Sequence, residues 1–96
     1  MKNVVRQIVN GVREEMYDAI EWGYDFFSFE KDFDRSTVIV EGRKVRMVSG
    51  YRFWDVSVLA DHDNDHESPM LEKAVLDALP SYDEVYDEVD NDMRFN

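Results

Sequence analysis

The sequence has no cysteine, two prolines, four glycines and no long hydrophobic run. Without cysteine, a disulfide-linked scaffold, a thiolate metal site and a cysteine nucleophile are all excluded. No stretch approaches the roughly 20 apolar residues that a membrane-spanning helix needs. At the N-terminus, Arg6, Gln7 and Asn10 interrupt the segment in which a signal peptide would have its apolar core. We therefore expect a cytoplasmic protein that does not cross a membrane.

Basic residues are scarce too, because 11 Lys and Arg stand against 22 Asp and Glu, and the formal net charge is -11. Such a charge repels phosphates over most of the surface, which argues against a nucleic-acid duplex or an anionic membrane as a direct partner. Apolar residues make up 44% of the chain and aromatic residues 14%, which suffices for a folded core. With 96 residues, the chain is expected to form a single domain over residues 1–96.

Residues 2–21 are predicted to form a helix. Apolar side chains recur there at spacings of three and four residues, which places them on one stripe of a helix. Charged side chains such as Arg6, Glu14 and Asp18 fall mostly on the other side. Gly23 is a suitable end, because glycine readily adopts the left-handed conformation that terminates helices. The stripe consists of Val5, Ile8, Val9, Val12, Met16, Ala19 and Ile20.

The middle of the chain predicts three or four antiparallel strands. The aromatic run 26–29 predicts a short first strand, and the charged residues 31–36 predict a turn. Residues 37–41 and 43–49 flank Gly42 closely, a pattern that is typical of a tight hairpin. We therefore expect two strands to meet in a turn at Gly42.

A further strand is predicted over residues 51–60, after a bulge or a second turn at Gly50. This strand alternates cleanly between two faces, so one face should be buried and the other partly wet. The face expected in the core carries Trp54, Val56, Val58 and Ala60, and the opposite face carries Tyr51, Phe53, Asp55, Ser57 and Leu59.

Two helices are predicted near the C-terminus. Ser68 and Pro69 suit the N-cap and the first position of the earlier helix, which Pro80 ends. Ser81 and Glu84 form a capping-box pattern at the start of the later helix. The residues expected to face inward are Met70, Leu71, Ala74, Val75, Ala78 and Leu79 in the earlier helix, and Tyr82, Val85, Tyr86 and Val89 in the later one. The expected fold class is therefore α+β, with an N-terminal helix, a three- to four-stranded antiparallel sheet and two C-terminal helices packed on one sheet face.

The charge is distributed unevenly along the chain. Residues 35–54 carry five basic residues and one acid, for a net charge of +4, whereas residues 55–93 carry one lysine and thirteen acids, for a net charge of -12. Cations on a strand commonly protect a sheet edge, and they also attract anionic partners. The protein is therefore polarised, and head-to-tail association of two copies through opposite charges is one expectation.

We expect a non-enzymatic domain that acts by binding another protein or a second copy of itself, as a homodimer. Protein interfaces are enriched in aromatic residues and arginine, and aromatic residues such as Trp22 and Tyr24 exceed what one small core needs. The predicted binding residues are Arg43, Lys44, Arg46, Tyr51 and Phe53 in the basic hairpin, and Asp83, Glu84, Asp87 and Glu88 in the acidic later helix, which also carries Asp90 and Asp92.

The acidic helix suggests an alternative function. Carboxylates spaced along a helix can imitate a row of phosphates and occupy the cleft of an enzyme that handles DNA or RNA. A small, strongly acidic chain without catalytic motifs suits such a nucleic-acid mimic, of the type that mobile elements encode. In that case the protein would inhibit its target enzyme by occupying the cleft in which the nucleic acid binds.

A third candidate function is the binding of Ca²⁺ or Mg²⁺ by an acidic loop. Four acids, Asp61, Asp63, Asp65 and Glu72, occupy positions 1, 3, 5 and 12 of the calcium-loop template. The match is partial, because position 6 holds a histidine where the sharp turn needs glycine, and position 9 holds a proline. The two histidines of this loop have the spacing of a helical zinc pair, but Asp and Asn favour turns there.

Enzyme motifs are weak. No serine lies in a nucleophile elbow, and the glycines are too dispersed to cradle a phosphate. Asp34, Glu41 and Lys44 partly resemble the motif of the PD-(D/E)xK nucleases, metal-dependent enzymes whose core also begins α-β-β-β-α. In that motif the lysine follows the glutamate by two residues, whereas here Arg43 stands at that position. We therefore expect no catalytic residues and no required cofactor.

Overall fold

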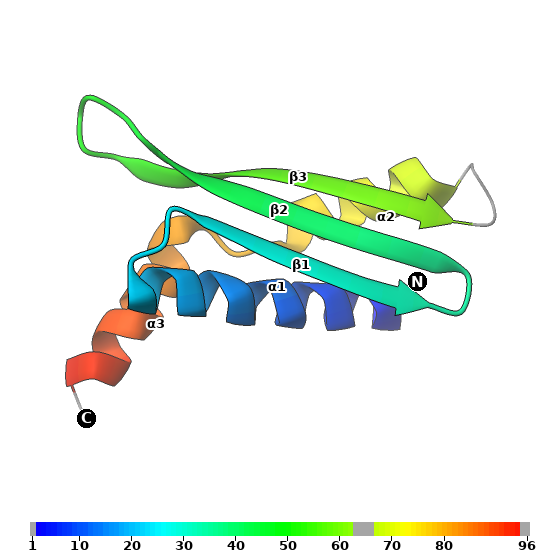
Figure 1. Ribbon diagram of the computed structural model, residues 1–96, viewed down its shortest axis with the longest axis horizontal. Coiled ribbons are helices and arrows are strands. Elements are labelled where there is room, and N and C mark those ends of the chain that lie inside the picture. Colours follow the sequence, from blue (N-terminus) through cyan, green and yellow to red (C-terminus); the bar gives the residue numbers. More distant parts are fainter. Residues whose placement is uncertain (1, 63–66, 95–96) are drawn as a thin grey trace.

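The structure is a computed structural model, and it describes residues 2–62 and 67–94. Three helices and three strands follow one another in this part of the chain as α1 (Lys2–Trp22), β1 (Phe26–Phe33), β2 (Ser36–Arg46), β3 (Arg52–His62), α2 (Glu67–Ala78) and α3 (Tyr82–Arg94). The strands form an antiparallel sheet in the order β1-β2-β3. Figure 1 shows α1 running along β1 and α2 lying behind β3. The predicted α+β fold class, with the helices packed on one sheet face, is confirmed.

Helix α1 follows the predicted bounds to within one residue at its C-terminal end. Its centre is fully buried in the core, because Ile8, Val12 and Met16 have no exposed surface. Gly23 ends the helix with φ of 76°, and the amide of Tyr24 donates to the Ala19 carbonyl at 2.8 Å. This is the Schellman arrangement that a glycine in the left-handed region permits. None of the described helices is long and apolar enough to cross a membrane.

Strands β1 and β2 are longer than predicted, because the charged segment 31–36 is not all turn. Lys31, Asp32 and Phe33 pair with Val38, Thr37 and Ser36 of β2, which leaves residues 34–35 as the connection. The prediction of a turn over the whole segment was wrong because it relied on local polarity. The partly buried ring of Phe33 packs against the core from within this segment.

The expected hairpin turn at Gly42 was also wrong. Gly42 lies inside β2, opposite Phe27 of β1 and Val56 of β3, and the chain turns at residues 47–51, where Gly50 has φ of 92°. The second-turn alternative for Gly50 is thus confirmed. Gly42 is a glycine for another reason, since a Cβ there would collide with the buried ring of Phe27. Within the part of the chain that the structure describes, the sheet consequently has three long strands and no fourth.

The C-terminal helices form as predicted, with local differences. Helix α3 begins after Ser81, whose Oγ accepts a hydrogen bond from the Glu84 amide at 3.2 Å, as an N-cap does. Helix α2 begins at Glu67, ahead of the predicted start at Ser68. Met70 and Ala78 of α2 and Tyr86 of α3 were expected to face inward but are exposed. The buried residues of α2 are Leu71 and Val75, and a residue one position away, as Met70 is from Leu71, is rotated by about 100° around the helix.

One core lies between the helices and the sheet face made by alternate residues of each strand. On β3 this face carries Trp54, Val56, Val58 and Ala60, as predicted from the alternation. Trp54 joins the layers, because its ring lies 5.0 Å from the ring of Phe27 on β1 and 5.2 Å from that of Tyr82 on α3. The opposite face of the sheet, which exposes Leu59, is not covered by any described helix.

Candidate functional site

The hairpin of β2 and β3 extends beyond the body of the molecule. Strand β1 ends its pairing where Phe26 meets Arg43, and β2 and β3 then continue as a pair to Arg46 and Arg52 before the turn. Figure 1 shows this end of the hairpin projecting past β1, α1 and α2. We call residues 43–53 the arm. All five residues predicted for the basic hairpin, namely Arg43, Lys44, Arg46, Tyr51 and Phe53, lie on it.

The arm is basic and contains no acidic residue. Its four cations are Arg43, Lys44, Arg46 and Arg52. Lys44 pairs with the Asp25 carboxylate at 3.0 Å, and Arg52 lies over the ring of Tyr86 at 4.6 Å. Among the residues that the structure describes, Arg43 and Arg46 form no ion pair. Within the described residues, the arm therefore keeps positive charge that no ion pair neutralises.

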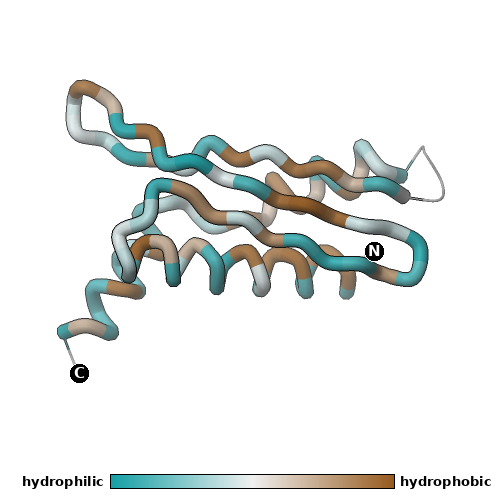
Figure 2. Tube along the Cα trace, in the orientation of Figure 1, coloured by the Kyte–Doolittle hydropathy of each residue, from teal (hydrophilic) through white to brown (hydrophobic). Residues whose placement is uncertain are grey.

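The tip of the arm is apolar. Met47 and Tyr51 are each 53% exposed, and the side chain of Val48 is fully exposed. Figure 2 shows this hydrophobic segment at the far end of the hairpin. Tyr51 stacks on Phe53 with 5.9 Å between the ring centroids, which stiffens one side of the tip. Large apolar side chains gathered at the end of a projecting hairpin are typical of an interaction site.

The acidic surface spans two helices. Asp83, Glu84 and Asp87 are exposed on α3, as the sequence predicted. The structure adds carboxylates from α1, which lies against α3. We call the combined surface the acidic face; it consists of Glu14, Asp18 and Glu21 on α1 and Asp83, Glu84, Asp87, Glu88, Asp90 and Asp92 on α3. The regular spacing of the α1 acids was the available signal for their contribution, and sequence reasoning missed it.

Part of the acidic face is neutralised within the molecule. Arg13 of α1 pairs with Glu88, its Nε donating at 3.2 Å, and Arg94 pairs with Asp90 at 3.2 Å. Six acids over the thirteen residues of α3 amount to about one carboxylate per 3.3 Å of helix, close to the spacing of roughly 3.4 Å per phosphate in one DNA strand. With two of them paired, the spacing rises to about 5 Å. The likeness to a phosphate row is therefore weaker than the sequence alone indicates.

The pKa of Tyr17 reports on a hydrogen bond that joins α1 to α3 at the acidic face. Its hydroxyl donates to Asp92 at 2.6 Å, and this hydrogen bond, assisted by burial and by nearby acids, raises the pKa of Tyr17 to about 12. We expect Asp92→Asn to lower this pKa towards 10.0, as measured by difference absorbance titration against a Tyr17→Phe variant. Because the folded state favours the protonated phenol, the stability from this bond is complete below about pH 10 and is lost as the pH rises through about 12. An unchanged pKa in Asp92→Asn would assign the shift to the other acids.

Two of the four residues predicted to bind metal, Asp61 and Glu72, belong to the described part of the chain. Asp63 and Asp65 lie outside the described residues. Asp61 is exposed on β3, and Glu72 Oε1 accepts a hydrogen bond from the Ala60 amide at 3.1 Å. No group of three His, Asp or Glu side chains that could hold a metal occurs among the described residues.

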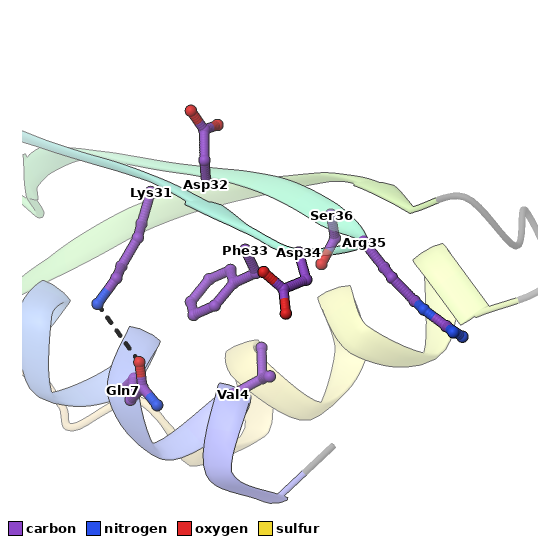
Figure 3. Close-up of a pocket in the computed structure, with 8 residues that line it drawn as sticks. All are labelled: Val4, Gln7, Lys31, Asp32, Phe33, Asp34, Arg35 and Ser36. Carbon is purple, nitrogen blue, oxygen red and sulfur yellow. Dashed lines mark hydrogen bonds between the residues drawn. The ribbon is translucent and has the colours of Figure 1, made fainter.

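A hollow lies between the first half of α1 and the connection of β1 to β2 (Figure 3). Lys31 reaches across it to donate to Gln7 at 3.3 Å, while the Asp32 carboxylate points away and that of Asp34 points towards it. One carboxylate facing a shallow hollow is not the convergent set of groups that acid–base catalysis needs. Glu41 lies five residues along β2 from the end of this hollow, about 17 Å away, so the partial nuclease motif is not assembled.

The site that the described residues support is therefore a pair of surfaces, the arm and the acidic face, which have opposite charge. Comparison with protein-family models, with curated proteins and with solved structures finds no match for this chain.

Proposed function

We propose that this protein is a non-enzymatic binding domain that recognises another protein through the arm and the acidic face. The observation that carries the proposal is the arm itself. A hairpin that projects beyond its sheet exposes apolar side chains at its tip and unpaired arginines along its length. These features weaken solubility unless a partner covers them, and arginine and aromatic residues are the side chains that interfaces favour.

The opposite charges of the two surfaces support specific orientation of a partner. Electrostatic complementarity accelerates association and excludes wrong partners, whereas the apolar tip supplies affinity. A partner with one acidic and one basic surface would fit both. A second copy of this chain also meets that description, and its arm would then face the acidic face of its neighbour.

The test is capture of partners from the native host by the immobilised protein. We expect the double variant Met47→Ser, Val48→Ser to reduce capture of a specific partner by about 30-fold, since two buried apolar anchors together contribute about 2 kcal/mol. The matched control is Leu59→Ser, Met70→Ser, which removes two exposed apolar side chains outside the arm. Equal capture by both double variants would contradict a role of the tip.

Light scattering coupled to size exclusion identifies the case in which the partner is a second copy. We expect a dimer that dissociates with rising salt if the arm meets the acidic face, because exposed charges are screened within about 10 Å at 0.1 M salt. A monomer at high protein concentration would leave a different protein as the partner.

A second candidate function is that of a nucleic-acid mimic. It is favoured by the joining of α1 and α3 acids into one acidic face, which is larger than α3 alone. Replacement of Asp83, Glu84 and Asp87 by Asn or Gln should then abolish capture of a DNA- or RNA-handling enzyme while the melting temperature stays unchanged. If the neutralised variant captures that enzyme as well as the original protein does, mimicry is not the function.

A further inference from the structure

Strand β3 forms an edge of the sheet, and two hydrogen bonds establish which of its backbone amides and carbonyls point away from the sheet. The amide of Ala60 donates to Glu72 of α2 at 3.1 Å, so it points away from β2. At the other end, the Tyr51 carbonyl accepts from the Met47 amide at 2.8 Å and so points towards β2. Backbone groups alternate in direction along an edge strand. The amides and carbonyls of Trp54 and Val56 therefore point outward, away from the sheet.

A groove runs beside this edge. Its one wall is the first half of β3, with Trp54 and Val56, and its other wall is the junction of α2 and α3, with Leu76, Leu79 and Tyr82. The groove has a volume of about 370 Å³. Proteins normally protect an exposed sheet edge from pairing with another strand. At Ala60 the Glu72 side chain does so by accepting a hydrogen bond from the backbone amide. The half from Arg52 to Val56 has no such cover among the described residues.

The indole nitrogen of Trp54 is a further sign of an incomplete site. Trp54 contributes to the groove, is only 8% exposed, and has no hydrogen-bond partner for its Nε1 among the described residues. A buried donor without a partner costs about 1–3 kcal/mol.

The end of the groove that lies nearest the arm is positively charged. Arg46 and Arg52 stand directly opposite each other on β2 and β3, and no described carboxylate pairs with either. Arg52 lies over the rings of Tyr82 and Tyr86 at 5.0 and 4.6 Å. A guanidinium that stacks on aromatic rings keeps its N–H groups free for a carboxylate. Two adjacent cations that form no ion pair with a described carboxylate favour an acidic ligand.

We propose that this groove binds an extended, acidic segment of a partner protein, which adds to the sheet as a strand beside β3. The inference rests on the proposed function as a protein-binding domain and names the chemistry of the partner. Backbone groups repeated at every second residue match a strand and not a helix. The acidic side chain would pair with Arg46 and Arg52. The β3 edge of a second copy fits less well, because it brings its own Arg52 and its Ala60 amide is already bonded to Glu72.

The probe is a fluorescein-labelled peptide, Asp-Val-Thr-Val-Thr-Val-Asp, with acids at both ends so that either strand direction is served. We expect saturable binding by fluorescence anisotropy, with amide shifts in ¹⁵N NMR centred on Trp54 and Val56. Val56→Pro removes an outward amide without removing a hydrogen bond to β2, and should weaken binding at least about tenfold, the equivalent of 1.4 kcal/mol. Val56→Ala keeps the amide and is the matched control.

The contribution of the two arginine charges to peptide binding is tested separately. The double variant Arg46→Gln, Arg52→Gln should weaken binding of the Asp peptide about tenfold but leave binding of an otherwise identical Asn peptide unchanged. If Val56→Pro does not fold, two peptides N-methylated on alternate amides replace it. One of them should fail to bind the unaltered protein.

Three results would overturn the inference: no saturable binding up to about 1 mM peptide, equal binding by Val56→Pro and Val56→Ala, or equal binding of both methylated peptides. These outcomes leave the proposed function standing if capture still depends on Met47 and Val48, which lie outside the groove. Peptide binding without any such dependence would instead contradict the proposed role of the tip.

Discussion

Trp54→Ala is expected to lower the free energy of unfolding by about 3–5 kcal/mol. Trp54 is the aromatic residue that connects β3 to β1 through Phe27 and to α3 through Tyr82. Truncation removes both ring contacts at once and leaves a cavity between the sheet and the helices. Since a domain of this size has a total stability of only about 5–14 kcal/mol, the variant should lie close to the limit of folding. Urea denaturation followed by circular dichroism measures the loss.

The chain offers a matched control in its other tryptophan. Trp22 is 69% exposed, so Trp22→Ala should change the stability by no more than about 0.5 kcal/mol. Trp54→Phe keeps a ring in the core and removes the unpaired indole nitrogen, so its cost should fall between the two. A Trp54→Ala variant as stable as Trp22→Ala would show that the three rings do not connect the layers.

Local patterns were sufficient to predict most of the fold. The helix over residues 2–21 and the end at Gly23 follow from spacing and from the conformational freedom of glycine. The buried face of β3 follows from strict alternation, because a strand with one wet face must bury every second side chain. The N-cap at Ser81 was equally local, since its hydroxyl bonds an amide only three residues away.

The features that local sequence patterns failed to predict depend on contacts between residues far apart in the sequence. The acidic face depends on Arg13 and Tyr17 of α1 meeting Glu88 and Asp92 of α3, each pair 75 residues apart. No periodicity within either helix contains that information. The groove beside β3 was missed for the same reason, because one wall comes from a strand and the other from the junction of two later helices. The residues of the basic hairpin were correctly grouped, although the turn was placed at the wrong glycine.

The fold places a cluster of basic residues on the arm, which contains no acidic residue, and most of the acidic residues on the body of the molecule. The cations of the arm project from a body in which acids dominate. Among residues 2–62 and 67–94, Lys44 is the one arm residue that forms an ion pair. An arm folded back on the acidic face would neutralise it within the molecule. Arg52 contacts α3 through the rings of Tyr82 and Tyr86, and no described carboxylate forms an ion pair with Arg43, Arg46 or Arg52.

Gly42 supports the second prediction of large effect. Gly42→Val should destabilise the fold by about 1–3 kcal/mol, although valine favours strands far more than glycine does. The central position of β2 leaves no room to shift, because β1 and β3 pair with it on both sides. The new side chain must displace the ring of Phe27, which is 4% exposed and packs edge-on against Trp54. Equilibrium unfolding in urea measures the change.

A double-mutant cycle separates this collision from a general intolerance of side chains at position 42. Phe27→Ala alone should cost about 3–5 kcal/mol, because it leaves a cavity beside Gly42. In the double variant the valine occupies part of that cavity, so the combined loss should be smaller than the sum by about 0.5–3 kcal/mol. The nearest contacts of a Cβ at Gly11 are with Phe29, so combining Gly11→Ala with Phe27→Ala should give a smaller departure from additivity than combining Gly42→Val with Phe27→Ala does. Strict additivity for Gly42→Val with Phe27→Ala would mean that the ring is not the reason for the glycine.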